Sequence, residues 1–237
     1  MQDLTLDEAL AEAFERARDL DVPLADKLQF FADAVRFASP TFADATERLV
    51  HRLQQSGTGA TAPKVGDEMP DFVLPDEQGK FISLGSLLRN GPVALSFHRG
   101  HWCPYCRINT SALAEAQCQV APLGGQIVAI TPDLRHFSTI LKPPGERGYF
   151  PILTDVDNGY AMSLNLTIFV GMEMRELMKG NGWDIAAYQG NDTWMLPIPA
   201  TFIVDSSGRI ASRYIDPDYR KRMAIEDIVD ALKRVQN

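Results

Sequence analysis

The sequence predicts an α/β protein in which a central mixed sheet is flanked by helices on both faces. Two apolar runs, Val93–Phe97 and Gln126–Thr131, have the length and composition of buried strands. Between them, a helical stretch begins at Pro104, extends to about Gln119 and is broken before the next strand by Gly124-Gly125. A further helix is expected after Pro132. This order of strand, helix, strand and helix is typical of a parallel βαβ unit.

Composition places the chain among ordinary globular proteins. Its 237 residues, 45% of them hydrophobic, suffice for one substantial domain and an appendage. The start, Met1–Thr5, lacks the basic and apolar character of a secretory signal, and no apolar run approaches the ~18 residues of a membrane span. With only three cysteines, a disulfide framework is not expected, so we predict a cytoplasmic, reducing setting.

The charge balance is acidic and excludes some classes of partner. The formal net charge is −8, and residues 1–55 hold eleven acidic and six basic side chains. We therefore expect neither nucleic acid nor an anionic membrane surface to be a partner.

Residues 1–56 are expected to form a helical extension of three helices. The first follows a capping-box pattern at Thr5–Glu8, and the third starts at Ser39-Pro40 and stops at Gly57. Apolar residues recur at helical spacing in each helix: Leu6, Leu10, Phe14 and Ala17; Leu24, Leu28, Phe31 and Val35; Phe42, Ala45, Leu49 and Leu53. These three faces must be buried, either on the rest of the chain or in a homodimer.

Small residues at 57–63 are typical of a linker, and residues 64–237 form the predicted main domain. Within it, the stretch 168–195 looks like an insertion whose methionines, Met172, Met174 and Met178, are spaced for helix packing. A proline-led strand then ends at Asp205, and a turn joins it to a partner strand over 210–214. The last helix presents one apolar face formed by Ile225, Ile228, Val229, Leu232 and Val235.

The candidate site is a Cys-x-x-Cys pair at the junction between the first buried strand and the helix that follows it. Cys103 and Cys106 lie three residues apart, so on a helix both side chains occupy one face. Pro104 suits the first helical position because it has no N–H to leave unpaired. Unpaired N–H groups at a helix start favour a nearby negative charge, which lowers the pKa of a thiol there. We interpret the pair as a redox-active dithiol.

Three blocks of sequence resemble the AhpC/TSA family of the thioredoxin superfamily. They are Val65–Asp76, Ser96–Arg107 and Leu196–Asp205, and the resemblance extends over roughly residues 64 to 235. It implies a thioredoxin-like fold in which Ile198-Pro199 is a cis pair packed against the cysteines. It also implies that Trp102 and Tyr105 shape the mouth of the site.

The resemblance leaves the roles of the two cysteines open. If the segment is aligned on the Trp-Cys-x-x-Cys motif of thioredoxin, Cys103 is the attacking thiol and Cys106 the resolving one. If it is aligned on the Thr-x-x-Cys motif of peroxiredoxins, Cys106 is the peroxidatic cysteine and Cys103 replaces the threonine. A typical peroxiredoxin also has a proline at the position that Arg99 occupies here and an arginine near the position of Pro199, and this chain has neither. On position alone we favour Cys103 as the nucleophile, because the residue at the helix start should be the more exposed.

Other side chains near the pair have two interpretations each. His101 could transfer a proton near neutral pH or be an exposed loop histidine, and Arg99 or Arg107 could lower a thiol pKa, hold a peroxide oxygen or simply be solvated. His98 and His101 could also join the two cysteines in a zinc site, although four ligands from so short a segment is an unfavourable arrangement. The remaining alternative is that the cysteines only pack.

Cys118 is separate from the pair. Twelve residues of continuous helix place it about 18 Å along the axis from Cys106, whereas a disulfide needs Cα atoms within about 7 Å. We predict that Cys118 is a core residue.

The leading functional hypothesis is a thiol oxidoreductase that reduces hydroperoxides through a Cys103–Cys106 disulfide. A thioredoxin- or glutathione-like donor would restore the dithiol, and no flavin, haem or metal is required. One alternative is a thioredoxin-like enzyme that reduces protein disulfides. Another is a non-enzymatic redox sensor or adaptor whose helical extension binds a partner when the pair is oxidised.

Overall fold

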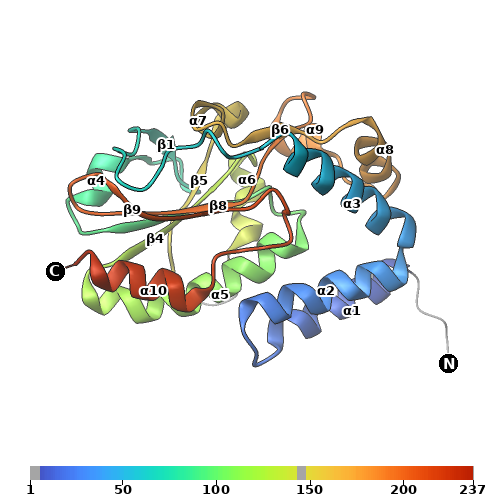
Figure 1. Ribbon diagram of the computed structural model, residues 1–237, viewed down its shortest axis with the longest axis horizontal. Helices are drawn as coiled ribbons and strands as arrows, with labels where there is room; N and C mark the ends of the chain where they lie inside the picture. The colour runs from blue at the N-terminus through green and yellow to red at the C-terminus, as the bar shows by residue number, and fades with distance from the viewer. Residues whose placement is uncertain (1–5, 143–147, 237) are drawn as a thin grey trace.

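The computed structural model describes residues 6–142 and 148–236, and a five-stranded mixed sheet lies at its centre (Figure 1). In spatial order its strands are β5 (Ile152–Thr154), β4 (Gln126–Thr131), β3 (Val93–Phe97), β8 (Ala200–Val204) and β9 (Ile210–Ile215). The first three are parallel, whereas β8 is antiparallel to β3 and β9 to β8. The predicted mixed sheet is confirmed.

The βαβ unit predicted from the sequence is formed by β3, α5 (Pro104–Val120) and β4. All five residues of β3 are buried, as expected for a strand with a neighbour on each side and layers on both faces. Its register pairs Val93 with Gln126 and Phe97 with Ile130. The carboxyl end of β3 therefore leads directly into the loop that precedes α5.

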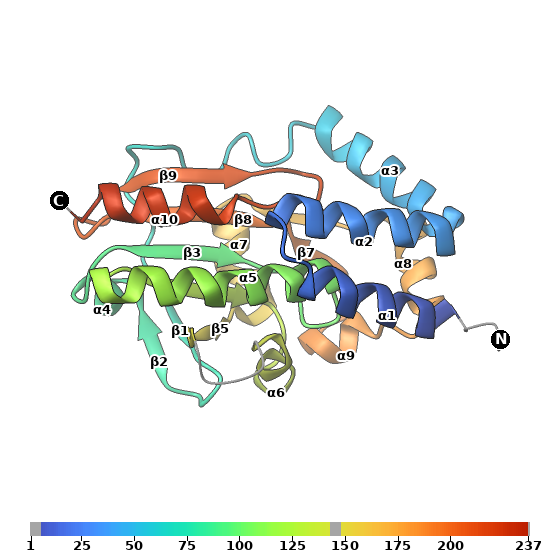
Figure 2. The same cartoon turned by 90° about the horizontal axis from the view of Figure 1, so that it is seen from below.

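Side chains of the sheet alternate between two cores. Ala94 and Ile203 face a core covered by α5 and α10 (Ile225–Arg234), which lie side by side (Figure 2). Leu95 and Phe202 face the opposite core. That second core is covered by the hairpin of β1 (Val73–Pro75) and β2 (Phe81–Ser83), by α4 (Leu84–Leu88) and by α7 (Gly159–Ser163).

The remaining elements are short. The helix expected after Pro132 is the single turn α6 (Arg135–Ser138). The predicted insertion contains β6 (Thr167–Phe169), α8 (Met172–Gly180) and α9 (Ile185–Gln189), and β6 pairs with β7 (Met195–Pro197). Met174 and Met178 of α8 are buried, which confirms their predicted role in packing, whereas Met172 is exposed. Three 3-10 turns complete the chain: Ala121–Leu123, Thr139–Leu141 and Val156–Asn158.

The three N-terminal helices are α1 (Leu6–Asp19), α2 (Leu24–Ala38) and α3 (Pro40–Gln55). The helices α1 and α2 lie side by side and pack on the N-terminal end of α5, while α3 packs on α8 (Figures 1 and 2). Phe31 of α2 makes edge-to-face contacts with Phe14 of α1 and Tyr105 of α5. Their apolar faces are thus buried within this chain, and the predicted capping residue Thr5 lies outside the described residues. Within 6–142 and 148–236, no helix combines the length and the apolar character needed to cross a membrane.

Two predictions about single residues are wrong. Cys118 is exposed, because only a stripe containing Leu113, Ala116 and Val120 faces the sheet near the end of α5. Cys118 is two residues, or about 200° around the axis, from Ala116. The Ile198–Pro199 peptide bond is trans: the chain passes directly from β7 to β8, with the Ile198 N–H donated to the Leu166 carbonyl.

Candidate active site

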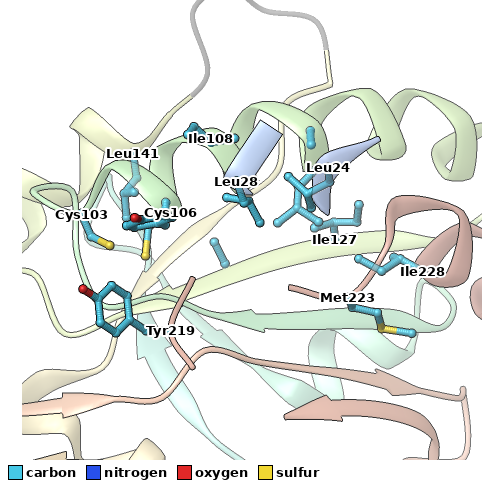
Figure 3. Packing of buried hydrophobic residues seen from close by; sticks show 14 of the residues in the cluster. Leu24, Leu28, Cys103, Cys106, Ile108, Ile127, Leu141, Tyr219, Met223 and Ile228 are labelled. Carbon is cyan, nitrogen blue, oxygen red and sulfur yellow. The ribbon is translucent and has the colours of Figure 1, made fainter. Parts of the chain in front are cut away.

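The Cys-x-x-Cys pair lies where the sequence places it, between the end of β3 and the start of α5. Cys103 is the residue immediately before the helix and Pro104 is the first helical residue. The N–H of Cys106 is donated to the Cys103 carbonyl at 3.0 Å, so the first turn brings the two side chains to one face. Figure 3 shows the two sulfur atoms next to each other on the side of Tyr219.

Both cysteines are buried, with 1% of Cys103 and none of Cys106 exposed. Cys103 is nevertheless the more accessible of the two thiols, as expected, because it lines a cavity that Cys106 does not line. The N-terminal helices and the segment before α10 cover the start of α5, which a sequence-based argument about helix ends does not include.

The loop between β3 and the cysteines requires glycine at one position. Gly100 has φ +141°, and a Cβ there would lie 2.8 Å from a carboxylate oxygen of Asp133 as well as against the Trp102 indole. This close approach holds Trp102 over the loop. It also places Arg99 and His101 on different sides of the turn, where they meet different neighbours.

Cys106 is surrounded by donors and positive charge. Its sulfur accepts the backbone N–H of Arg99 at 3.3 Å and Nη2 of Arg222 at 3.4 Å. Burial by itself would raise the pKa of the Cys106 thiol, but a hydrogen bond from Cys103, the charge of Arg222 and the nearby His98 ring outweigh it. The pKa of Cys106 is therefore well below its ordinary value.

Cys103 is shifted in the opposite direction. Burial raises the pKa of its thiol, and so does the hydrogen bond between the two cysteines, because the Cys103 proton is held by its negatively charged neighbour. The pair is thus best described as one thiol and one thiolate, with the negative charge on Cys106. This geometry favours the second cysteine as the reactive sulfur, whereas position in the sequence favoured the first.

The two histidines of this segment have separate environments. His98 is buried, and its Nε2 lies 3.0 Å from the Ser96 hydroxyl, whereas its Nδ1 has no hydrogen bond of normal geometry to nitrogen or oxygen. His101 Nδ1 lies 3.2 Å from Asp133, and its ring stacks on Phe137. Among the residues that the structure describes, no three His, Cys, Asp or Glu side chains are grouped so that they could hold a metal.

His101 is not an exposed loop histidine, because only 11% of its side chain is accessible. Asp133, which the sequence analysis did not single out, is fully buried and accepts the His101 N–H at 2.6 Å. Burial raises the pKa of this carboxyl group. Its position directly after the end of strand β4, in Thr131-Pro132-Asp133, is the signal that could have identified it.

Arg99 is 4% exposed, so the interpretation of it as a solvated surface residue is wrong. Its guanidinium carbon lies 3.8 Å from the centre of the Tyr219 ring and 5.0 Å from that of Trp102. Arg107 is half-buried and lies against Phe14 of α1, with 4.3 Å between guanidinium and ring centre.

Tyr219 and Arg222 are two further site residues that sequence reasoning missed. They come from the segment between β9 and α10, more than a hundred residues after the cysteines. Basic residues cluster there, at Arg220, Lys221 and Arg222, but nothing in their spacing relates them to a Cys-x-x-Cys. Only the packing of α10 on α5 brings them to it.

Pro199 is buried and lies beside the site. Phe97, the last residue of β3, pairs with Ala200, so the preceding residue on β8 is next to His98 in the register. Pro199 therefore lies next to the end of β3, from which the dithiol loop leaves, and its peptide bond is trans; its packing against the cysteines stays a prediction.

A cavity of about 280 Å³ opens above Cys103. Trp102, Tyr105, Arg99 and Cys103 form its floor, whereas Cys106 is not among its lining residues. Residues of α1, α2 and α3 and the segment after α8 close it from the other side, among them Phe14, Phe31, Phe42 and Trp183. Trp102 and Tyr105 thus both line the cavity, and their role in shaping its mouth stays a prediction.

Comparison of the sequence with models of protein families identifies one family. The model of the AhpC/TSA family matches residues 65–213, which begins after the three N-terminal helices. No curated protein matches the chain.

Solved structures of peroxiredoxins have a similar fold. The peroxidoxin BcpB of Mycobacterium tuberculosis superposes with a TM-score of 0.53 at 20% identity, covering 73% of this chain and 99% of its own. AhpC of the same organism gives 0.54 at 13% identity over 74% and 94%. A mutant of peroxiredoxin 6 of Arenicola marina gives 0.57 at 15% identity over 73% and 74%. At such identities the likeness concerns the fold, which is thioredoxin-like, and the family follows from the match over residues 65–213: the chain belongs to the AhpC/TSA family.

Proposed function

We propose that the protein is a thiol peroxidase that reduces hydroperoxides with Cys106 as the attacking thiolate and Cys103 as the resolving thiol. The observation that carries this proposal is the environment of the Cys106 sulfur, which accepts the Arg99 N–H and an Arg222 N–H. A thiolate, not a thiol, is the nucleophile toward peroxides, and the hydrogen bond from Cys103 and the charge of Arg222 lower the pKa of Cys106.

In the first half of the cycle, the Cys106 thiolate attacks the terminal oxygen of the hydroperoxide. The O–O bond breaks, an alkoxide or hydroxide leaves and takes up a proton, and Cys106 becomes a sulfenic acid. The Arg99 guanidinium lies at the cavity floor, where negative charge develops on the leaving oxygen. Cys103 and Arg99 both line the cavity, and the peroxide would approach the Cys106 sulfur between them.

In the second half, the Cys103 sulfur attacks the sulfenic sulfur of Cys106. An S–S bond forms, the S–O bond breaks and water leaves with the Cys103 proton. The short spacing of the pair within one helical turn makes this closure possible without unfolding α5. An external dithiol of the thioredoxin type, or a glutathione-like thiol, then reduces the disulfide, and the cycle needs no flavin, haem or metal. We expect it to operate in a reducing compartment such as the cytoplasm.

A second candidate function is the reduction of protein or small-molecule disulfides. It is favoured by one observation: Cys103, not Cys106, is the sulfur that lines the cavity. In that reaction Cys103 attacks the substrate disulfide after passing its proton to Cys106, and Cys106 then releases the product.

Stopped-flow oxidation of the reduced protein by hydrogen peroxide and by an organic hydroperoxide separates these functions. Trp102, which contacts the dithiol loop, provides a fluorescence signal. Fast oxidation that is abolished in Cys106→Ser and stops at the sulfenic acid in Cys103→Ser supports the peroxidase. Oxidation no faster than that of a free thiol, together with rapid reduction of a disulfide substrate, would exclude the peroxidase and support the disulfide reductase.

A further inference from the structure

We propose that the cavity above the dithiol binds the apolar substituent of an organic hydroperoxide, so that bulky apolar hydroperoxides are preferred over hydrogen peroxide. For the reaction itself this inference rests on the proposed function. The binding site does not, because it is defined by the cavity walls and can be tested with a compound that has no O–O bond.

The walls are built of aromatic rings that fix one another. Phe14 and Phe31 meet edge to face at 6.5 Å between ring centres, and Phe42 meets Trp183 in the same way at 5.5 Å. Trp183 in turn lies 5.7 Å from Trp102 of the dithiol loop. Glu15, Arg107 and Asn181 also line the cavity, but the surface formed by these rings is apolar and favours an apolar group over water.

The size of the cavity limits that group. Its volume of about 280 Å³ is at the lower end of the ~300–1,000 Å³ typical of sites for drug-sized ligands. A single aryl group or a compact branched alkyl group fits these dimensions, whereas hydrogen peroxide leaves most of the apolar wall without a partner.

The floor of the cavity supplies the orientation. Arg99 is buried, and its guanidinium has no hydrogen bond or ion pair to any residue in 6–142 or 148–236; its neighbours are the faces of Tyr219 and Trp102. A buried cation without an ionic partner is costly, so a ligand that brings negative charge to it is favoured. The oxygen end of the hydroperoxide therefore points down to Arg99 and the dithiol, and the apolar substituent points up toward α1 and α2.

Most of the apolar roof comes from α1, α2 and α3, which precede the part of the chain that matches the AhpC/TSA family. The dithiol and the selectivity are thus contributed by different parts of the chain. A change in the roof should alter which hydroperoxide is used without altering the sulfur chemistry.

The binding test uses cumyl alcohol, the product alcohol of cumene hydroperoxide, measured by titration calorimetry on the full-length reduced protein. Val35→Trp fills the cavity from α2 and Leu10→Trp fills it from α1, whereas Ala25→Trp adds the same side chain at an exposed position of α2. We expect the alcohol to bind the natural protein and Ala25→Trp equally, and to bind both filled variants at least about ten times more weakly. Two independent fillings keep the test valid if one variant does not fold.

The kinetic test compares oxidation of the same proteins by cumene hydroperoxide and by hydrogen peroxide. We expect the filled variants to lose about tenfold or more in rate with cumene hydroperoxide and to lose clearly less with hydrogen peroxide, whose small size needs little of the cavity. No binding of the alcohol to the natural protein, or equal binding by all variants, would overturn the cavity as the site. Binding that is lost on filling, with no oxidation by either hydroperoxide, would instead overturn the proposed function and with it the hydroperoxide as occupant.

Discussion

The floor and the roof of the cavity differ in chemistry and in origin. The floor and the groups directly beneath it hold buried charge: the Arg99 guanidinium lies over the Tyr219 ring, and Arg222 contacts the Cys106 thiolate. The roof, from α1 to α3, presents mainly apolar side chains to the cavity; among the described residues of these helices Glu15 is its one charged lining residue, and ion pairs such as Arg36 with Asp44 lie at the surface. Exposed pairs of this kind contribute little to stability.

This difference separates two tasks. A reaction that creates negative charge needs fixed donors and cations around the reacting atoms, and burying such groups is costly where they are not paired. Recognition of an apolar group needs only a dry surface of suitable shape. Changes in the floor should therefore alter rate and pH dependence, and changes in the roof should alter stability and substrate preference.

The largest effect is expected from removal of the floor's thiolate. Cys106→Ser should slow oxidation by any hydroperoxide by more than about 10³-fold, because the nucleophile itself is lost. Stopped-flow kinetics on the reduced variant measures this. The matched control is Cys118→Ser, since Cys118 is exposed and remote from the site, and it should keep the natural rate. A variant that loses Cys106 and remains a fast peroxidase would assign the chemistry to Cys103.

The next largest effect concerns the stability of the roof. Phe31→Ala removes the ring that joins α1 to Tyr105 of α5, and we expect the free energy of unfolding to fall by about 3–5 kcal/mol. Denaturant unfolding gives this value. Phe37→Ala on the same helix is the control: its side chain is 91% exposed, so stability should change little. Equal losses in both variants would contradict the packing of α2 on the dithiol helix.

A smaller effect is expected from the cation that contacts the thiolate. Arg222→Met removes the Nη2 donor 3.4 Å from the Cys106 sulfur, so the pKa of Cys106 should rise and oxidation near neutral pH should slow by about tenfold. Lys221→Met changes the neighbouring exposed cation, which pairs with Asp216, and should leave the rate unchanged. If the two variants behave alike, Arg222 has no specific role at the thiolate.

The smallest effect is expected when the hydrogen bond between the two cysteines is removed. It is a shift in the pKa of Cys106, which the ultraviolet absorbance of the thiolate measures. Because the pKa of Cys106 is lowered, the absorbance should rise at a pH well below ~8.5, the pKa of an ordinary thiol. Cys103→Ser keeps a donor to Cys106 and should nearly keep this midpoint. Cys103→Ala removes the donor and should move the midpoint upward, by about one pH unit. An identical midpoint in the two variants would show that Cys103 does not stabilise the thiolate.

Local sequence determined the elements and the position of the dithiol. The strands Val93–Phe97 and Gln126–Thr131, the start of α5 at Pro104 and the three N-terminal helices follow from hydrophobic period and from capping or breaking residues, all of which act within a few residues. The placement of both cysteines on one helical turn follows from the same short-range geometry.

The tertiary structure alone decided which sulfur carries the charge and what lies above it. The exposure of Cys103 depends on α1 and α2, and the low pKa of Cys106 depends on Arg222, which is 116 residues away in sequence. Burial and electrostatic neighbours are properties of all elements packed around a group, and Cys118, whose side chain faces solvent, was mispredicted for the same reason. A pattern of residues specifies the period of its own helix or strand, but it does not specify which distant segment will cover it.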